Sequence, residues 1–279
     1  MIKKILGTSA ILLTSVFVLT GCGNSKKNSK DDTKLTVAAS PSPHAEILEH
    51  VAPLMKKEGI ELEVKKFDDY VMPNKALASG DVDANYFQHV PFYKKSVKEN
   101  DYKFAIAGAI HIEPMGLYSK TIKKIKDLKN GSTIITSDSE SDWGRIINIL
   151  QKANLVKLKS GVNFETATFD DISENPKNLK FVHNVKPEIL VQAYKNDEGT
   201  LVAINANFAY SAKLNPMKDA ILLEKDNSPY VNILAIRKED EKLKKIKKLN
   251  DALHKKEVQD WISKRWNDSV KPVASNNWK

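Results

Sequence analysis

Aromatic, amide and imidazole side chains gather in residues 67–93, which read FDDYVMPNKALASGDVDANYFQHVPFY. Residues 72–79 predict a short helix, because Pro73 falls in its first turn, where a missing N–H costs nothing. Residues 82–87 predict a strand, and His89 lies just beyond its carboxyl end. Ligands bind at that end of the strands in open α/β sheets. A packed corner with satisfied polar groups explains the same stretch, so its meaning depends on the rest of the chain.

Arg145 is a candidate anion-binding residue, since it directly precedes a helix predicted at residues 146–153. The N–H groups at a helix N-terminus favour an anion, and arginine can bind a carboxylate through two hydrogen bonds. The acidic loop SDSESD at residues 137–142 offers an alternative partner. The sequence leaves open whether Arg145 binds a ligand or that loop.

Amide side chains complete the set of candidate binding groups. Asn205 and Asn207 lie at or just beyond the end of a predicted strand, and Asn232 lies near the start of another. Together with Arg145 and the aromatic residues, they suit a small zwitterion with an apolar side chain. Arginine would take its carboxylate, amide oxygens its ammonium group, and aromatic rings its side chain.

Patterns typical of catalytic and metal sites are missing from the sequence. It has no histidine pair at metal spacing, no Gly-rich phosphate loop and no G-x-S-x-G elbow. His44, His50 and His254 fall on predicted helices and are expected at the surface or in packing. His89 and His111 follow or lie on strands and could line a cleft. With no nucleophile–base pair, we predict no enzyme activity, no metal and no cofactor.

The spacing of apolar residues predicts an α/β fold that opens strand, helix, strand, as in a parallel sheet covered by helices. The folded part is long enough for two lobes. The last two predicted helices would cover the first lobe. We predict strands at residues 35–39, 60–64, 82–87, 104–112, 133–136, 181–184, 201–205, 220–223 and 229–236, and helices at residues 44–57, 72–79, 90–98, 146–153, 187–194, 206–214, 239–253 and 256–266.

The N-terminus has the layout of a secretory signal peptide at residues 1–21, with a basic start, an apolar run and small residues before Cys22. The sequence LTGC at residues 19–22 resembles a bacterial lipobox, in which the cysteine is lipidated. An ordinary signal peptide with a chance cysteine is the alternative. Residues 22–34 read as a solvated tether. Because Cys22 is the only cysteine, an intramolecular disulfide is excluded.

The net charge of +9 includes Lys3 and Lys4 of the predicted signal peptide. The other lysines are scattered or mixed with acidic residues, as in EDEKLKKIKK at residues 239–248, which indicates solvated helix faces. We therefore predict no nucleic-acid partner, and only a weak preference for anionic lipid headgroups. No second apolar run is long enough to cross a bilayer. We expect a protein on the extracytoplasmic side of the cell membrane, attached by a lipid anchor.

Long motifs across the mature chain resemble those of the NlpA-type lipoproteins, the methionine-binding proteins of methionine ABC importers. The resemblance implies a two-lobe, type II periplasmic-binding-protein-like α/β fold, each lobe a mixed sheet flanked by helices, with the ligand in the cleft between them. We place lobe 1 at residues 35–117 and 228–279, and lobe 2 at residues 118–227. The motifs are LTGC at 19–22, FDDYVMPNKAL at 67–77, DVDANYFQHVPF at 81–92, HIEPMGLYS at 111–119, INANFA at 204–209 and SPYVNI at 228–233.

The resemblance also implies which residues contact methionine. Three ring-bearing residues would hold its side chain, an arginine its carboxylate and two asparagines its ammonium group. In that order, these residues are Tyr70, Phe87 and His89; Arg145; and Asn207 and Asn232.

One loop departs from the family pattern, which usually has an asparagine two residues before the Gly-Arg pair. Here residues 137–143 read SDSESDW, which is more acidic and bulkier. Since a short methionine-containing peptide would carry its amino group farther from its carboxylate, such a peptide could approach an acidic side chain. We therefore hypothesise a specificity loop formed by Asp138, Glu140, Asp142 and Trp143.

The favoured interpretation is a lipid-anchored solute-binding protein that delivers methionine or a methionine-containing dipeptide to a membrane ABC permease. Hinge closure would trap the ligand, with chain crossings near Tyr118 and at residues 224–230. An extracellular enzyme on the same fold, using His89 as a general base, is one alternative. A surface adhesin is another.

Overall fold

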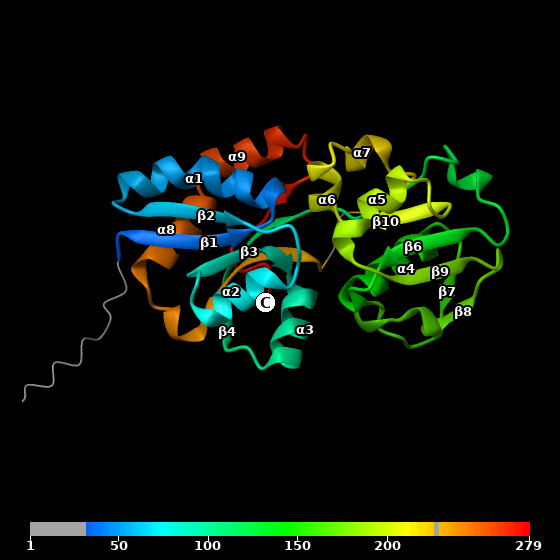
Figure 1. Ribbon diagram of the computed structural model, residues 1–279, viewed down its shortest axis with the longest axis horizontal. Helices are drawn as coiled ribbons and strands as arrows, with labels where there is room; N and C mark the ends of the chain where they lie inside the picture. The colour runs from blue at the N-terminus through cyan, green and yellow to red at the C-terminus, as the bar shows by residue number, and fades with distance from the viewer. Residues whose placement is uncertain (1–31, 226–228) are drawn as a thin grey trace, which may run out of the picture. The chain divides into compact units, whose positions relative to one another are not determined.

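The computed structural model describes residues 32–225 and 229–279, whose strands form two main sheets (Figure 1). The predicted signal peptide, Cys22 and the tether up to residue 31 lie outside the described residues. Among the described helices, none has the length and apolar character needed to cross a membrane.

The first sheet has six strands in the order β2-β1-β3-β12-β4-β13. β1 pairs in parallel with β2 and β3, whereas β12 lies antiparallel between β3 and β4. A strand from the C-terminal part thus lies at the centre of a sheet built mainly by the N-terminal part. The strands are β1 (Lys34–Ala39), β2 (Glu61–Lys66), β3 (Ala84–His89), β4 (Phe104–Ile112), β12 (Val231–Arg237) and β13 (Lys271–Pro272).

Helices cover both faces of this sheet (Figure 1). Successive side chains of a strand point to opposite faces, so Val37 packs in one buried cluster and Ala38 in another. Both faces are therefore apolar, as a sheet covered on two sides requires. One face carries α1 (Glu46–Lys57), α8 (Lys244–Leu253) and α9 (Lys256–Arg265), and the other α2 (Met72–Ser79) and α3 (Val90–Asn100).

The second sheet has five strands in the order β11-β5-β10-β6-β9. β10 is parallel to β6 and antiparallel to β5. Ile134 packs with α4 on one face, and Ile135 packs with α5 and α6 on the other. The elements are β5 (Gly116–Tyr118), β6 (Thr133–Ser137), β9 (Lys180–Val185), β10 (Leu201–Ile204), β11 (Leu222–Leu223), α4 (Glu140–Lys152), α5 (Leu190–Lys195), α6 (Ala206–Ser211) and α7 (Pro216–Asp219), with β7 (Lys157–Leu158) and β8 (Ile172–Glu174) paired beside them.

The predicted α/β order is confirmed. The short elements β5, β7, β8, β13 and α7 were not predicted, and several other elements differ at their ends. α4 begins at Glu140, six residues before the predicted start, so Asp142 and Arg145 lie on the helix itself. Acidic residues in a first turn favour that turn through the helix dipole, although SDSESD shows no apolar period. The helix predicted from residue 44 begins at Glu46 after an irregular turn, and the one predicted from residue 239 begins at Lys244.

The chain passes from the first sheet to the second after Ile112 and returns at Val231. Gly116 and Leu117, which we predicted in lobe 1, pair with strands of the second sheet. The remaining lobe boundaries stay a prediction. The carboxyl ends of β3 and β10 place polar residues at the edges where the two sheets face each other across the candidate site.

Candidate ligand-binding site

A small cavity lies between residues that belong to both sheets. The space left between its walls is about 20 Å³, which is room for about one water molecule. A ligand of amino-acid size therefore needs the walls to move apart. The lining residues are Tyr70, Phe87, Gln88, His89, Phe92, Glu113, Arg145, Asn205, Ala206 and Asn232.

Five of the six predicted ligand-binding residues line this cavity, and the sixth contacts one of them. Tyr70 donates a hydrogen bond from its hydroxyl to Oδ1 of Asn207, at 2.6 Å. Asn207 is buried and does not line the cavity in the described state. The structure thus brings all six together, with Asn207 behind the Tyr70 hydroxyl.

An aromatic wall forms the apolar side of the cavity. The Tyr70 ring lies 6.0 Å from the Phe87 ring and 5.7 Å from the Phe92 ring, measured between centroids. Phe208, from α6, lies 5.2 Å from Tyr70 on another side. Ring pairs at these distances stabilise one another. The wall can surround an apolar side chain on several sides.

Arg145 supplies the positive charge, and buried acids already surround it. Its guanidinium pairs with Glu224, lies 3.6 Å from Oδ1 of Asp142, and donates to the backbone carbonyl of Glu113 at 3.2 Å. It also lies over the ring of Tyr230, 4.4 Å from the centroid. Burial opposes the charge, but Glu224 and Asp142 outweigh it and hold the pKa of Arg145 above its ordinary value. The sequence left open whether Arg145 binds a ligand or the acidic loop at residues 137–142. In the structure, Asp142 of that segment is one of its partners.

Asp142 links groups from the two sheets. Its carboxylate lies 3.1 Å from Nε2 of His89, on β3, and accepts a hydrogen bond from Asn205 at 3.1 Å. Burial opposes its charge, but the bond from His89 and the charge of Arg145 outweigh burial, so the pKa of Asp142 is lowered. His89 Nδ1 accepts the backbone N–H of Phe92 at 3.2 Å. The imidazole proton must then sit on Nε2 and point at Asp142.

Glu113 is a cavity residue that we did not predict. It follows β4 directly, at a strand end, and this position was the signal that could have identified it. Behind it lie two buried imidazoles: His44 Nε2 is 4.0 Å and His111 Nε2 is 3.8 Å from its carboxylate oxygens. His44 Nε2 also lies 2.9 Å from Oδ1 of Asn232, and His111 Nδ1 contacts the Tyr86 hydroxyl at 2.5 Å.

These three groups also form a donor set with the composition of a metal site. One donor atom from each of His44, His111 and Glu113 lies within 4.8 Å of the others. The sequence predicted no metal. His44 Nε2 is already hydrogen-bonded to Asn232, and a metal ligand would have to give up that bond.

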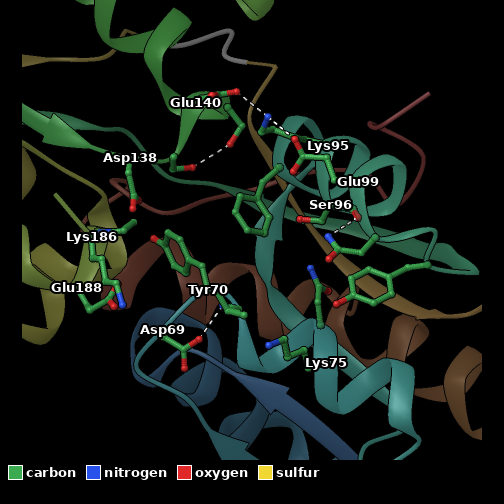
Figure 2. Close-up of a pocket in the computed structure, with 18 residues that line it drawn as sticks. Asp69, Tyr70, Lys75, Lys95, Ser96, Glu99, Asp138, Glu140, Lys186 and Glu188 are labelled. Atoms are coloured by element: carbon green, nitrogen blue, oxygen red, sulfur yellow. Dashed lines mark hydrogen bonds and ion pairs between the residues drawn. The ribbon is translucent and has the colours of Figure 1, made fainter. Parts of the chain in front are cut away.

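A wider cleft of about 700 Å³ lies on the other side of Tyr70 and Phe92. Asp138 and Glu140 of the hypothesised specificity loop line it, and Glu140 pairs with Lys95 of α3 at 2.7 Å. Figure 2 shows Tyr70 in the middle of this cleft, with Asp138 and Glu140 on one side and Lys95 near Glu140. Asp142 lines neither space, but it contacts His89, Asn205 and Arg145, which line the inner cavity.

Trp143, the fourth residue of that loop, lines neither space. Its indole N–H donates to the Ser137 carbonyl at 2.8 Å, and its ring packs beside Phe169 and His183. Its described contacts are therefore within the second sheet and its loops.

The model of the NlpA lipoprotein family matches residues 35–274. The chain belongs to the NlpA lipoprotein family. This match spans both sheets and every residue of the cavity described above.

Individual proteins are similar to this chain over most of its length. The methionine-binding lipoprotein MetQ of Bacillus subtilis is 47% identical over 97% of this chain and 99% of its own. A crystal structure of a pheromone cOB1 precursor/lipoprotein of the YaeC family from Enterococcus faecalis is 60% identical, with a TM-score of 0.85, over 86% of this chain and 100% of that one. A nutrient-binding protein from Burkholderia cenocepacia, solved bound to methionine, is 38% identical, with a TM-score of 0.80, over 86% and 99%. The two-lobe binding-protein fold predicted for this NlpA lipoprotein is confirmed.

Proposed function

We propose that this protein is a lipid-anchored, extracytoplasmic solute-binding protein that delivers methionine, or a methionine-containing short peptide, to an ABC importer. The observation that carries the proposal is the inner cavity, with aromatic rings on one side and buried charged and amide groups on the other. Two similar proteins support it, since one is named for binding methionine and the other was solved with methionine bound.

Each part of methionine has a matching group in the cavity. The rings of Tyr70, Phe87 and Phe92 suit the thioether, because a sulfur near a ring edge gains about 0.3–1.5 kcal/mol. Arg145 is the cation for the carboxylate, and Asn232 presents an amide oxygen to the ammonium group. Asn207 joins this set once a ligand or lobe motion displaces the Tyr70 hydroxyl from it.

Capture of the ligand involves opening and closing of the two lobes. A space of about 20 Å³ is far below the 300 Å³ or more of an ordinary ligand pocket. The described arrangement is therefore too tight for the ligand, which must enter a more open one. Hinge motion at the crossings after Ile112 and before Val231 would provide that opening.

The dipeptide alternative rests on the wider cleft. It shares Tyr70 and Phe92 with the inner cavity, so a second residue attached to methionine could extend past these rings. Asp138 and Glu140 line that cleft and would face a displaced ammonium group. Competition between L-methionine and methionine dipeptides tests this, and preference for free methionine over every dipeptide would exclude a role for this cleft in ligand choice.

The membrane anchor of the proposal is Cys22, which lies outside the described residues. A diacylglycerol on that cysteine would provide two acyl chains, enough for stable attachment. The variant Cys22→Ala should then appear in the soluble fraction of expressing cells, while the parent chain stays with the membranes. Equal membrane retention of both would contradict lipidation at Cys22.

An enzyme that uses His89 as a general base is disfavoured by the geometry. Nδ1 accepts the Phe92 N–H and Nε2 donates to Asp142, so neither nitrogen is free to take a proton from a substrate. The relatives reported above are named for binding or as lipoproteins. Recovery of unchanged methionine after prolonged incubation with the protein is the expected result, and a converted product would favour the enzyme alternative.

Isothermal titration of residues 23–279 tests the proposal. Residues 32–279 form a compact unit of their own, so the leader can be omitted. We expect saturable binding of L-methionine with one site per chain, compared with D-methionine and methionine dipeptides. Absence of binding to all of these ligands would refute the proposed ligand class.

A further inference from the structure

Glu113 is a buried carboxyl group at the cavity with no hydrogen-bond partner for one of its oxygens. Oε2 contacts no donor within hydrogen-bond distance in the part of the chain that is described. The side chain is 9% exposed and lines the cavity together with Arg145 and Asn232. Since a buried, unpartnered carboxylate is costly, such a group calls for an explanation.

Arg145 is the cation beside Glu113, and its charge lowers the pKa of Glu113, but burial outweighs it. Burial lowers the pKa of His44 to about 4 and of His111 to about 3, so both imidazoles are neutral at neutral pH. Arg145 donates to the backbone carbonyl of Glu113, while its charge is paired with Glu224 and Asp142.

Other titratable groups face the same region from every neighbouring element. His89 lowers the pKa of Glu113, but burial outweighs it, and the other groups are tyrosines and acids, which add no positive charge. The titratable groups are Tyr70 before α2, Tyr86 and His89 on β3, Asp142 on α4, Tyr210 on α6, and Glu224 and Tyr230 between β11 and β12.

We propose that Glu113 binds the ammonium group of the ligand, and that ligand capture drives a proton from Glu113 into solvent. This rests on the proposed function, since the ligand must be an amino acid or peptide with Arg145 at its carboxylate. In the empty cavity the Glu113 carboxyl holds a proton; with the ligand, the ammonium group stabilises the carboxylate and that proton leaves. No bond other than the O–H bond is broken, so charge and protons balance.

Two observations support this assignment. Burial is the largest influence on the pKa of Glu113 and raises it, which favours the protonated form before ligand enters. Asn232 lines the same cavity as Glu113, and its Oδ1 lies 2.9 Å from His44 Nε2. Since an amide oxygen only accepts, His44 carries its proton on Nε2, which fixes Asn232 with its oxygen toward the same region. A carboxylate and an amide oxygen together suit an ammonium group.

The pH dependence follows from the sign of the shift. Below the pKa of Glu113 in the empty protein, binding must expel a proton, so affinity falls as pH falls, by at most about tenfold per pH unit for one proton. Above that pKa the group is already ionised and affinity is independent of pH. The dependence of affinity on pH should be absent in Glu113→Gln, because glutamine keeps the shape of the side chain and cannot ionise.

The test is calorimetry of residues 23–279 with L-methionine in buffers of different ionisation enthalpy, between about pH 5 and about pH 8. We expect proton release that grows toward one per ligand as the pH falls. In Glu113→Gln the release should vanish and affinity for methionine should fall by about tenfold to hundredfold. The control is Glu174→Gln, at an exposed glutamate on β8. This substitution should leave both the proton release and the methionine affinity unchanged.

A second ligand, 4-(methylthio)butanoate, which is methionine without its amino group, separates the possible failures. Its affinity should be nearly equal in the parent protein and in Glu113→Gln, with no proton release. If the parent protein binds methionine without releasing protons, the role of Glu113 is refuted and the proposed function stands. If it does not bind methionine, the proposed function itself is refuted. Loss of binding on chelation, restored by Zn²⁺, would instead make His44, His111 and Glu113 a metal site and overturn the proposal.

Discussion

Replacing Asp142 with asparagine should weaken the connection between the two sheets. Asp142 is fully buried, and its two oxygens serve His89 from one sheet and Asn205 from the other side, both at 3.1 Å. An asparagine keeps one acceptor oxygen but turns an NH₂ group toward the second donor. It also removes a negative charge 3.6 Å from Arg145.

The cost can be worked from these contacts. Loss of one hydrogen bond to a charged group costs about 1.5–3 kcal/mol, and the uncompensated part of the arginine charge adds to it. We expect Asp142→Asn to lower the free energy of unfolding by about 2–4 kcal/mol, which lowers Tm by roughly 5–10 °C for a domain of this size.

Urea and thermal unfolding followed by circular dichroism measure this effect at neutral pH. The control is Asp170→Asn, at an exposed aspartate of the same sheet region. Because the pKa of Asp142 is lowered in the fold from its ordinary value of 3.8, its contribution is present above that value and is lost as the pH falls through the native pKa. The difference between parent and variant should therefore shrink in acid. A variant as stable as the parent at neutral pH would refute the assigned role of Asp142.

Three further substitutions separate binding from stability. Phe87→Ala should weaken methionine binding about tenfold or more, because it removes one wall of the aromatic enclosure; calorimetry measures it, and unchanged affinity would contradict the assigned wall. Tyr70→Phe loses the hydrogen bond to Asn207 and should cost about 0.5–1.5 kcal/mol in the free energy of unfolding, measured by urea titration; a larger loss would mean that the hydroxyl has another partner. Trp143→Phe loses its bond to the Ser137 carbonyl and should cost about 1 kcal/mol while methionine affinity stays unchanged; a change in affinity would place Trp143 at the site after all.

The sequence predicted the meeting of His89, Arg145 and Asn232, because their strands and helix end or begin at the same edges. The sequence could not predict pairings between residues that are far apart in the chain. Arg145 and Glu224 are separated by 79 positions, and no periodicity relates two such residues. That pairing depends on how β11 and β5 align in the second sheet.

Two other residues were assigned to the wrong secondary structure for local reasons. Asp142 was read as part of a loop, since SDSESD has polar residues at every position and no apolar stripe to mark a helix. His44 was expected on a helix, whereas residues Pro41–Ala45 form an irregular turn with non-helical angles at Ser42, so the helical period did not predict the direction of its ring. Glu113 directly follows β4, as His89 ends β3. The rule that ligands bind at the carboxyl ends of strands could therefore have identified it.

Native mass spectrometry of residues 23–279, purified without added ligand and then titrated with L-methionine, tests the central claim most directly. The account predicts that one methionine per chain is either retained through purification or taken up on titration, and that Arg145→Ala loses it. Failure of the parent chain to hold methionine or any methionine dipeptide would contradict the account.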